Sequence, residues 1–192
     1  MMTMKTMLLV SAVAVLSFSC DEENTGNGSC AGQLVTILSV VDGDTIKAEE
    51  LDKSIRLLGI NAPETSGTNA EACPLQWENM SIDEQDEFRE DCCYGEQAKV
   101  FLTNLLPPGT QVCLVNPEGG KPEQDIYQRT LADVYVGSTF VNAKLIVSGY
   151  ARAYKDFPHP TKAEEFEQLE DKAQSILVGM WGYCAATSDT SK

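Results

Sequence analysis

Three short segments carry the side chains that could perform chemistry. Residues 41–47 contain an Asp-Gly-Asp turn, residues 55–65 contain an arginine followed by a Pro-Glu pair, and residues 125–132 contain a second arginine. Taken singly, each has an ordinary structural interpretation. Asp-Gly-Asp is common in hairpin turns, and an arginine on a strand commonly forms a surface ion pair. Together they supply carboxylates and guanidinium groups.

Several other catalytic chemistries lack their residues in this chain. The only histidine, His159, lies between Pro158 and Pro160, and there is no Gly-x-Ser-x-Gly or Gly-x-x-x-x-Gly-Lys motif. No Cys-x-x-Cys spacing occurs either, which argues against a zinc site. Any catalysis must therefore use carboxylates and arginines, with or without a hard metal ion.

The composition suits one compact exported domain with appendages. The chain has 192 residues, of which 43% are hydrophobic, and a formal net charge of −15. Such an acidic protein is a poor match to one whose whole surface binds nucleic acid. Any phosphate-binding site must therefore be local. A monomer is the default expectation.

The first residues resemble an export signal. Lys5 is followed by an apolar run at residues 7–18, then by Ser19 and Cys20. The run is too short to be a permanent transmembrane helix. We predict a signal peptide at 1–19, lipidation at Cys20 and a flexible tether at 20–32. The protein would then be a lipoprotein facing the periplasm or the cell surface, and simple secretion is the alternative.

The cysteine count agrees with export. Seven cysteines occur, and lipidation of Cys20 leaves six, an even number that suits disulfide pairing in an oxidising compartment. Six cysteines allow about 15 pairings. We expect Cys30 to pair with Cys184, at the two ends of the domain. The remaining cysteines would pair among themselves: Cys73, Cys92, Cys93 and Cys113.

Hydrophobic periodicity predicts an α+β fold, a small closed barrel with helices at its side. The expected strands span residues 33–41, 45–48, 55–60, 111–115 and 129–136, the first of them buried on much of both faces. The expected helices span residues 94–106 and 140–147, and a C-terminal helix begins at a Thr161-x-x-Glu164 capping box. The domain would cover residues 33–184, followed by a disordered tail at 185–192.

One segment departs from this pattern. Residues 66–93 hold eight acidic residues and one basic residue, Arg89, which gives 1 − 8 = −7, together with three cysteines. We interpret this segment as an acidic surface insertion stapled by disulfides. Its charge would then lie away from the site.

Several short motifs follow one another along residues 33–182. They are Asp42-Gly43-Asp44-Thr45, the arginine-bearing strand and Pro-Glu turn of residues 56–64, Tyr94-Gly95, the Tyr-x-Arg-x-Leu-Ala run of residues 127–132, Val141-Asn142 and Gly179-Met180-Trp181. In this order and spacing they resemble the motifs of the staphylococcal nuclease family. The resemblance implies a five-stranded OB-type β-barrel with about three α-helices.

The resemblance also implies roles for individual residues. Glu64 looks like the general base that activates water, and Arg56 and Arg129 look like the pair that binds the phosphate. The family's reaction is calcium-dependent hydrolysis of DNA and RNA that leaves 3′-phosphate ends, on single-stranded or melted nucleic acid. These residue types suit it, because arginine binds two phosphate oxygens and never loses its proton.

The implied calcium ligands are Asp44, the carbonyl of Ala62, and Asn61. Oxygen-only ligands favour calcium over zinc. The family has an aspartate where this chain has Asn61, so we expect weaker calcium binding. Together with the acidity, this departure leaves an alternative open, a non-catalytic OB-fold binding module on an exported lipoprotein. A structural surface lipoprotein whose insertion docks a partner is a third interpretation.

Overall fold

A computed structural model describes residues 30–65, 81 and 92–186. The predicted signal peptide, the lipidation site, most of the tether, most of the insertion and the end of the tail lie outside the described residues. Within the described part of the chain, no helix combines the length and the apolarity needed to cross a membrane.

A closed barrel forms the centre of the fold. Five strands neighbour one another in the order β3-β2-β1-β5-β7, and β7 closes the ring by pairing in parallel with β3. This confirms the predicted α+β fold with a five-stranded OB-type barrel. The barrel strands are β1 (Gln33–Val40), β2 (Thr45–Ala48), β3 (Ile55–Leu57), β5 (Gln111–Val115) and β7 (Thr130–Val136). Short strands β6 (Glu123–Gln124) and β8 (Thr139–Phe140) add to β7, while β4 (Ile60–Asn61) pairs with β9 (Arg152–Ala153).

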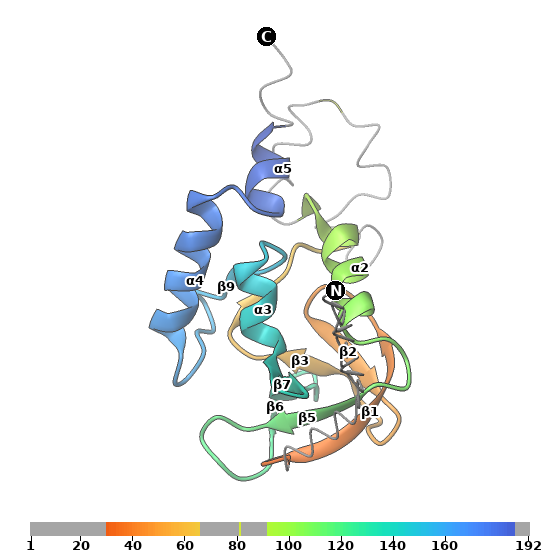
Figure 1. Ribbon diagram of the computed structural model, residues 1–192. Coiled ribbons are helices and arrows are strands. Elements are labelled where there is room, and N and C mark those ends of the chain that lie inside the picture. The colour runs from red at the N-terminus through yellow and green to blue at the C-terminus, as the bar shows by residue number, and fades with distance from the viewer. Residues whose placement is uncertain (1–29, 66–80, 82–91, 187–192) are drawn as a thin grey trace, which may run out of the picture.

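The described helices lie together at one end of the barrel (Figure 1). They are α2 (Gly95–Leu105), α3 (Val141–Val147), α4 (Ala163–Ser175) and α5 (Met180–Ala186). Helix α2 packs against β1, whereas α4 packs against α3 and β9. Both α2 and α4 turn an apolar stripe inward, with Ala98 and Leu102 buried on α2 and Phe166 and Ala173 on α4.

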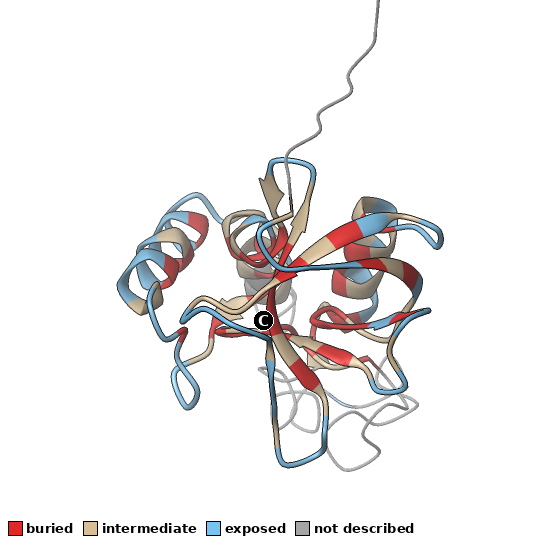
Figure 2. Cartoon of the chain, turned by 90° about the horizontal axis from the view of Figure 1, so that it is seen from below, coloured by how far each residue is buried: buried red, intermediate tan, exposed pale blue. Residues whose placement is uncertain are grey.

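Alternation along β1 shows how the core is built. Val35 and Ile37 point into the barrel and are fully buried, while Leu34 and Leu38 on the opposite face are 53% and 52% exposed. The prediction that this strand is buried on both faces is therefore wrong, because the outer face of the barrel meets solvent here. Buried residues gather on the inner faces of the strands and on the adjoining helix faces (Figure 2).

The strand predicted at residues 55–60 is divided in two by Gly59. Its φ of 68° is in the left-handed region that favours glycine. A Cβ at this position would lie 2.4 Å from the Cβ of His159. Gly59 therefore lets the chain turn from β3 into β4 while His159 packs against it.

The disulfides correct the predicted pairing. Cys30 is bonded to Cys113, and Cys93 is bonded to Cys184. Cys92 is also disulfide-bonded. The expected Cys30–Cys184 pair is wrong because β1 lies beside β5, with Leu34 opposite Cys113, so the chain entering β1 meets Cys113. Strand order cannot be read from cysteine spacing.

The start of α4 also differs from the prediction. Helix α4 begins at Ala163 with Lys162 as its N-cap and no side-chain cap, so Thr161 does not form the expected capping box. Instead, the backbone N–H groups of Thr161 and Lys162 donate to Nδ1 of buried His159, at 3.2 and 3.0 Å. Because Nδ1 accepts, the proton lies on Nε2, which donates to Asp133 Oδ1 at 2.7 Å.

His159→Ala should lower the free energy of unfolding by about 2–4 kcal/mol, because it leaves the buried Asp133 carboxylate without its donor and two N–H groups without an acceptor. Urea denaturation followed by circular dichroism measures the change. The exposed residue Asp156 lies in the same loop, and Asp156→Ala is the matched control, expected to change stability by less than about 0.5 kcal/mol. An equally small effect of His159→Ala would contradict this structural role.

Candidate active site

The strand register brings the segments of the two predicted arginines next to each other. Arg56 on β3 pairs with Thr45 on β2 and with Leu131 on β7. Arg129 directly precedes β7 and lies two residues before Leu131 along the chain. Both side chains are partly buried on the outside of the barrel.

The Asp-Gly-Asp turn leading into β2 brings a carboxylate next to Arg56. The N–H of Asp44 donates to Asp42 Oδ1 at 3.1 Å, which fixes the turn. Gly43 lies so close to its neighbours that an added Cβ would be 2.6 Å from the Cβ of Ala62 and 2.8 Å from that of Ala98. The turn therefore packs tightly between β4 and helix α2, which holds Asp44 inward.

Asp44, Arg56, Asn61 and Ala62 form one connected cluster. Arg56 Nη1 lies 2.6 Å from Asp44 Oδ2, and Arg56 Nη2 donates to Asn61 Oδ1 at 3.1 Å. The N–H of Ala62 donates to Asp44 Oδ2 at 2.8 Å. The structure thus joins the first arginine to all three residues expected to bind a metal.

Burial dominates the electrostatics of Asp44. Removal from water raises the pKa of this carboxyl to about 7, and the charge of Asp42 acts in the same direction, while the Arg56 guanidinium opposes the rise. The nearby arginine therefore compensates only part of the cost of a buried negative charge. An additional cation beside Asp44 would favour its charged form.

The donor set at this position is all oxygen. The expected ligands are the Asp44 carboxylate, the Asn61 side-chain carbonyl and the backbone carbonyl of Ala62, and Arg56 contacts the first two. Such donors suit a hard cation such as calcium. No group of three or more His, Cys, Asp or Glu side chains capable of holding a metal occurs among the described residues. A cation would thus be held here by one carboxylate and neutral oxygens, a combination that fits calcium with modest affinity.

Arg56 is largely enclosed by its neighbours. Its Nη1 is buried and lies against the Asp44 carboxylate. The ring of Tyr154 lies 5.8 Å from the guanidinium carbon. The guanidinium therefore places a fixed positive charge at this site.

Glu64 lies on the segment that leaves β4, two residues after Ala62. The side chain is half-buried, so solvent can reach it. Its backbone carbonyl is so close to Gly95 that a Cβ there would be 1.8 Å from the Glu64 oxygen. Only glycine fits at this contact, which fixes the predicted catalytic segment against the first turn of α2.

Arg129 is held by its own turn. Arg129 Nε donates to Asp125 Oδ2 at 2.7 Å, and the ring of Tyr127 lies 5.4 Å from the guanidinium carbon. The sequence of this segment predicted a role for Arg129 but none for Asp125 or Tyr127, and Tyr154 beside Arg56 was not predicted. The signal that could have found Asp125 is an acid four residues before an arginine in a turn.

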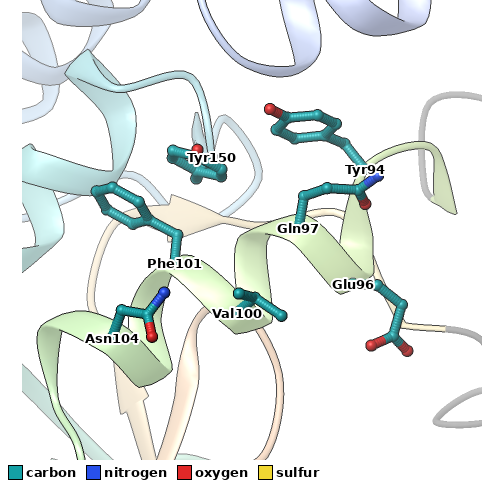
Figure 3. A pocket seen from close by; sticks show the side chains of 7 residues that line it. All are labelled: Tyr94, Glu96, Gln97, Val100, Phe101, Asn104 and Tyr150. Atoms are coloured by element: carbon teal, nitrogen blue, oxygen red, sulfur yellow. The ribbon is translucent and has the colours of Figure 1, made fainter.

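A separate groove of about 340 Å³ runs along α2 (Figure 3). Tyr94, Phe101 and Tyr150 form one wall, with Tyr150 stacked between the other two rings at centroid distances of 4.1 Å to Phe101 and 5.4 Å to Tyr94. Gln97 and Asn104 also line the groove. Among the described residues, its lining includes none of the predicted site residues and no lysine or arginine.

Comparison with known proteins gives an independent family match. Residues 54–183 match the model of a family described as staphylococcal nuclease homologue. That range includes Arg56, Glu64 and Arg129, while Asp44 lies before it.

Curated relatives align over most of the chain. A thermonuclease from Staphylococcus hyicus is 29% identical over 91% of this chain and 94% of its own length. A thermonuclease from Staphylococcus intermedius is 28% identical over 93% of this chain and 96% of its own length. An uncharacterized endonuclease from Haemophilus influenzae is 27% identical over 90% of this chain and 75% of its own length.

Proposed function

Because the chain belongs to the staphylococcal nuclease family, we propose that it is an exported, calcium-dependent nuclease that hydrolyses single-stranded or melted DNA and RNA. One observation supports this most directly. Arg56 is joined by contacts of 2.6 and 3.1 Å to Asp44 and Asn61, and it pairs with Leu131, two residues after Arg129. These contacts support a site in which the two arginines and a bound calcium ion would surround a phosphodiester.

The proposed roles follow from the charges. Arg56 and Arg129 bind the phosphate oxygens and stabilise the negative charge that increases on them in the transition state. Glu64 takes a proton from water, and the water oxygen attacks phosphorus. The bond from phosphorus to the 5′ oxygen breaks, and that oxygen gains a proton. The products are a 3′-phosphate and a 5′-hydroxyl.

Asp44, Asn61 and the Ala62 carbonyl would hold the calcium ion. When bound, the ion supplies positive charge that offsets the phosphate and the buried carboxylate. The protein residues provide the orientation of the reacting groups. They orient the phosphate against Glu64, and Asp44 and Asn61 fix the Arg56 guanidinium in one position.

The acidity of the chain predicts weak binding and slow association. From Cys20 onward the sequence has 13 basic and 29 acidic residues, which gives −16. Approaching nucleic acid is repelled on average, so only local attraction at the two arginines favours binding.

Digestion of single-stranded DNA tests the mechanism. Calcium should support cleavage, a chelator should abolish it, and Glu64→Gln should slow it by about 10²–10⁴-fold because the general base is lost. Glu49→Gln, an equal charge change at an exposed residue, should leave the rate unchanged. Cleavage that survives both the chelator and Glu64→Gln would reject the mechanism.

A second candidate function is a non-catalytic OB-fold binding module. The hydrogen bond that engages Asn61 Oδ1 with Arg56 favours it, because this oxygen is less available to a metal. Binding of oligonucleotide by the wild-type protein, with no cleavage at any calcium concentration, would identify this function.

Asn61→Asp should raise calcium affinity by about tenfold, because a second carboxylate adds negative charge to the ligand set. Isothermal titration of calcium into the protein without nucleic acid measures the change. Asn104→Asp, at an exposed position on α2, controls for the added charge. If the two variants gain calcium affinity equally, Asn61 is not a calcium ligand.

We also propose lipid anchoring at Cys20, which lies outside the described residues. The observed disulfides agree with an oxidising compartment. Expressed with its own N-terminus in a bacterial host, the wild-type protein should fractionate with membranes, and Cys20→Ser should become soluble. Wild-type protein found only in the soluble fraction would refute the anchor and favour simple secretion.

A further inference from the structure

The turn that carries Arg129 is closed by one carboxylate. Asp125 Oδ1 accepts from the backbone N–H groups of Tyr127 and Arg129, both at 2.9 Å, and Oδ2 accepts from Arg129 Nε at 2.7 Å. Backbone bonds complete the turn, with Asp125 N–H donating to the Arg129 carbonyl at 3.0 Å and Gln128 N–H to the Asp125 carbonyl at 2.9 Å. Gln128 has a φ of 64°, which the turn requires.

Two contacts restrain the Arg129 guanidinium from different sides. Asp125 holds the Nε edge, and the Tyr127 ring lies 5.4 Å from Cζ. Within the described residues, the two terminal nitrogens of Arg129 have no hydrogen-bond or ion-pair partner. The far edge of the group, with its pair of parallel N–H donors, is therefore the edge available to a ligand. That edge matches two oxygens of a phosphate.

Arg56 is held at its terminal nitrogens, whereas Arg129 is held at Nε. Its terminal nitrogens contact Asp44 and Asn61, and its side chain is 11% exposed, compared with 33% for Arg129. The two arginines therefore differ in how accessible their terminal nitrogens are to an anion. Arg129 presents a free edge to an arriving anion, whereas Arg56 is engaged by protein groups.

We propose that Asp125 is a positioning residue, which fixes Arg129 so that its terminal nitrogens are pre-aligned to capture a phosphodiester of single-stranded nucleic acid. This rests on the proposed function. The Asp125 side chain is 16% exposed and anchored by three donors, so it can hold the guanidinium without using any nitrogen that the phosphate needs. Positioning of this kind lowers the entropy lost on binding and acts mainly on KM.

If Asp125 acted through its charge alone, its neutralisation would strengthen substrate binding, whereas a positioning role predicts weaker binding. A carboxylate beside a polyanion site repels the substrate, so its neutralisation should improve binding if Asp125 had no positioning role. Under the proposal, Asp125→Asn removes the acceptor of Arg129 Nε, while the amide oxygen can still accept from the two backbone N–H groups. The direction of the effect therefore separates the two explanations.

The kinetic test compares Asp125→Asn with Glu165→Gln. Glu165 forms an exposed ion pair with Lys162 at 2.9 Å, so its neutralisation is a matched change of charge. Asp125→Asn should lower kcat/KM on oligodeoxythymidylate by about 10–100-fold, chiefly by raising KM, while its melting temperature stays near that of Glu165→Gln. An unchanged or higher kcat/KM would overturn the proposal. Asp125→Glu should recover part of the loss, because its carboxylate can still reach Nε.

A double-mutant cycle tests whether Asp125 acts through Arg129. In an Arg129→Gln background, Asp125→Asn should have no further effect on kcat/KM. If the decreases in kcat/KM caused by Asp125→Asn and by Arg129→Gln add fully in the double variant, the proposal is overturned. This outcome applies even if Asp125→Asn lowers the stability of the protein.

Binding separates this proposal from the proposed function. In a Glu64→Gln background, fluorescence anisotropy with labelled oligodeoxythymidylate should show about tenfold weaker binding when Asp125→Asn is added. If the wild-type protein cleaves nothing but this difference appears, the nuclease assignment fails and the positioning role stands. If the wild-type protein cleaves and Asp125→Asn behaves like Glu165→Gln, the positioning role fails and the nuclease assignment stands.

Discussion

The candidate site depends on one ion pair taken out of water, Arg56 with Asp44. Their side chains are only 11% and 8% exposed. Desolvation of two charges is costly, and their mutual attraction offsets it only when further hydrogen bonds satisfy the remaining donors and acceptors. Here the N–H of Ala62 and the Thr45 hydroxyl donate to Asp44, and Asn61 accepts from Arg56. The pair therefore ties the β2 turn, β3 and β4 into one unit.

The barrel gives the two arginines different surroundings, although Arg56 pairs with Leu131, two residues after Arg129. Arg56 is on a central strand, between β2 and β7, where neighbours surround it. Arg129 ends a turn between β6 and β7, and its side-chain partners among the described residues, Asp125 and Tyr127, belong to that turn. The solvent-facing arginine on its rigid turn suits initial capture of an anion, and the buried arginine beside a carboxylate suits the later stabilisation of charge close to the phosphorus.

The sequence predicted the barrel and its strand positions well, because alternating residues such as Val35 and Ile37 carry a strong period-two signal. It could not predict pairing across the fold. Cys30 meets Cys113 only because β1 and β5 are neighbours, and nothing in the spacing of cysteines records that. No role was predicted for His159 because it is the chain's single histidine, although it organises the start of α4. Its partners, Asp133 and two N–H groups, are defined by tertiary packing. Motif comparison placed Arg56 and Asp44 in the same site, but the contact of Asn61 with Arg56 required coordinates.

The two described disulfides have a topological consequence. They join residues 83 and 91 positions apart, and the loops that they close overlap between Cys93 and Cys113. Every peptide bond from Cys30 to Cys184 therefore lies inside at least one closed loop. A protease that cuts the backbone once, anywhere in that range, produces two fragments that remain covalently linked. Wherever proteases act on the folded protein, a nicked molecule can stay assembled and keep both arginines on the same barrel.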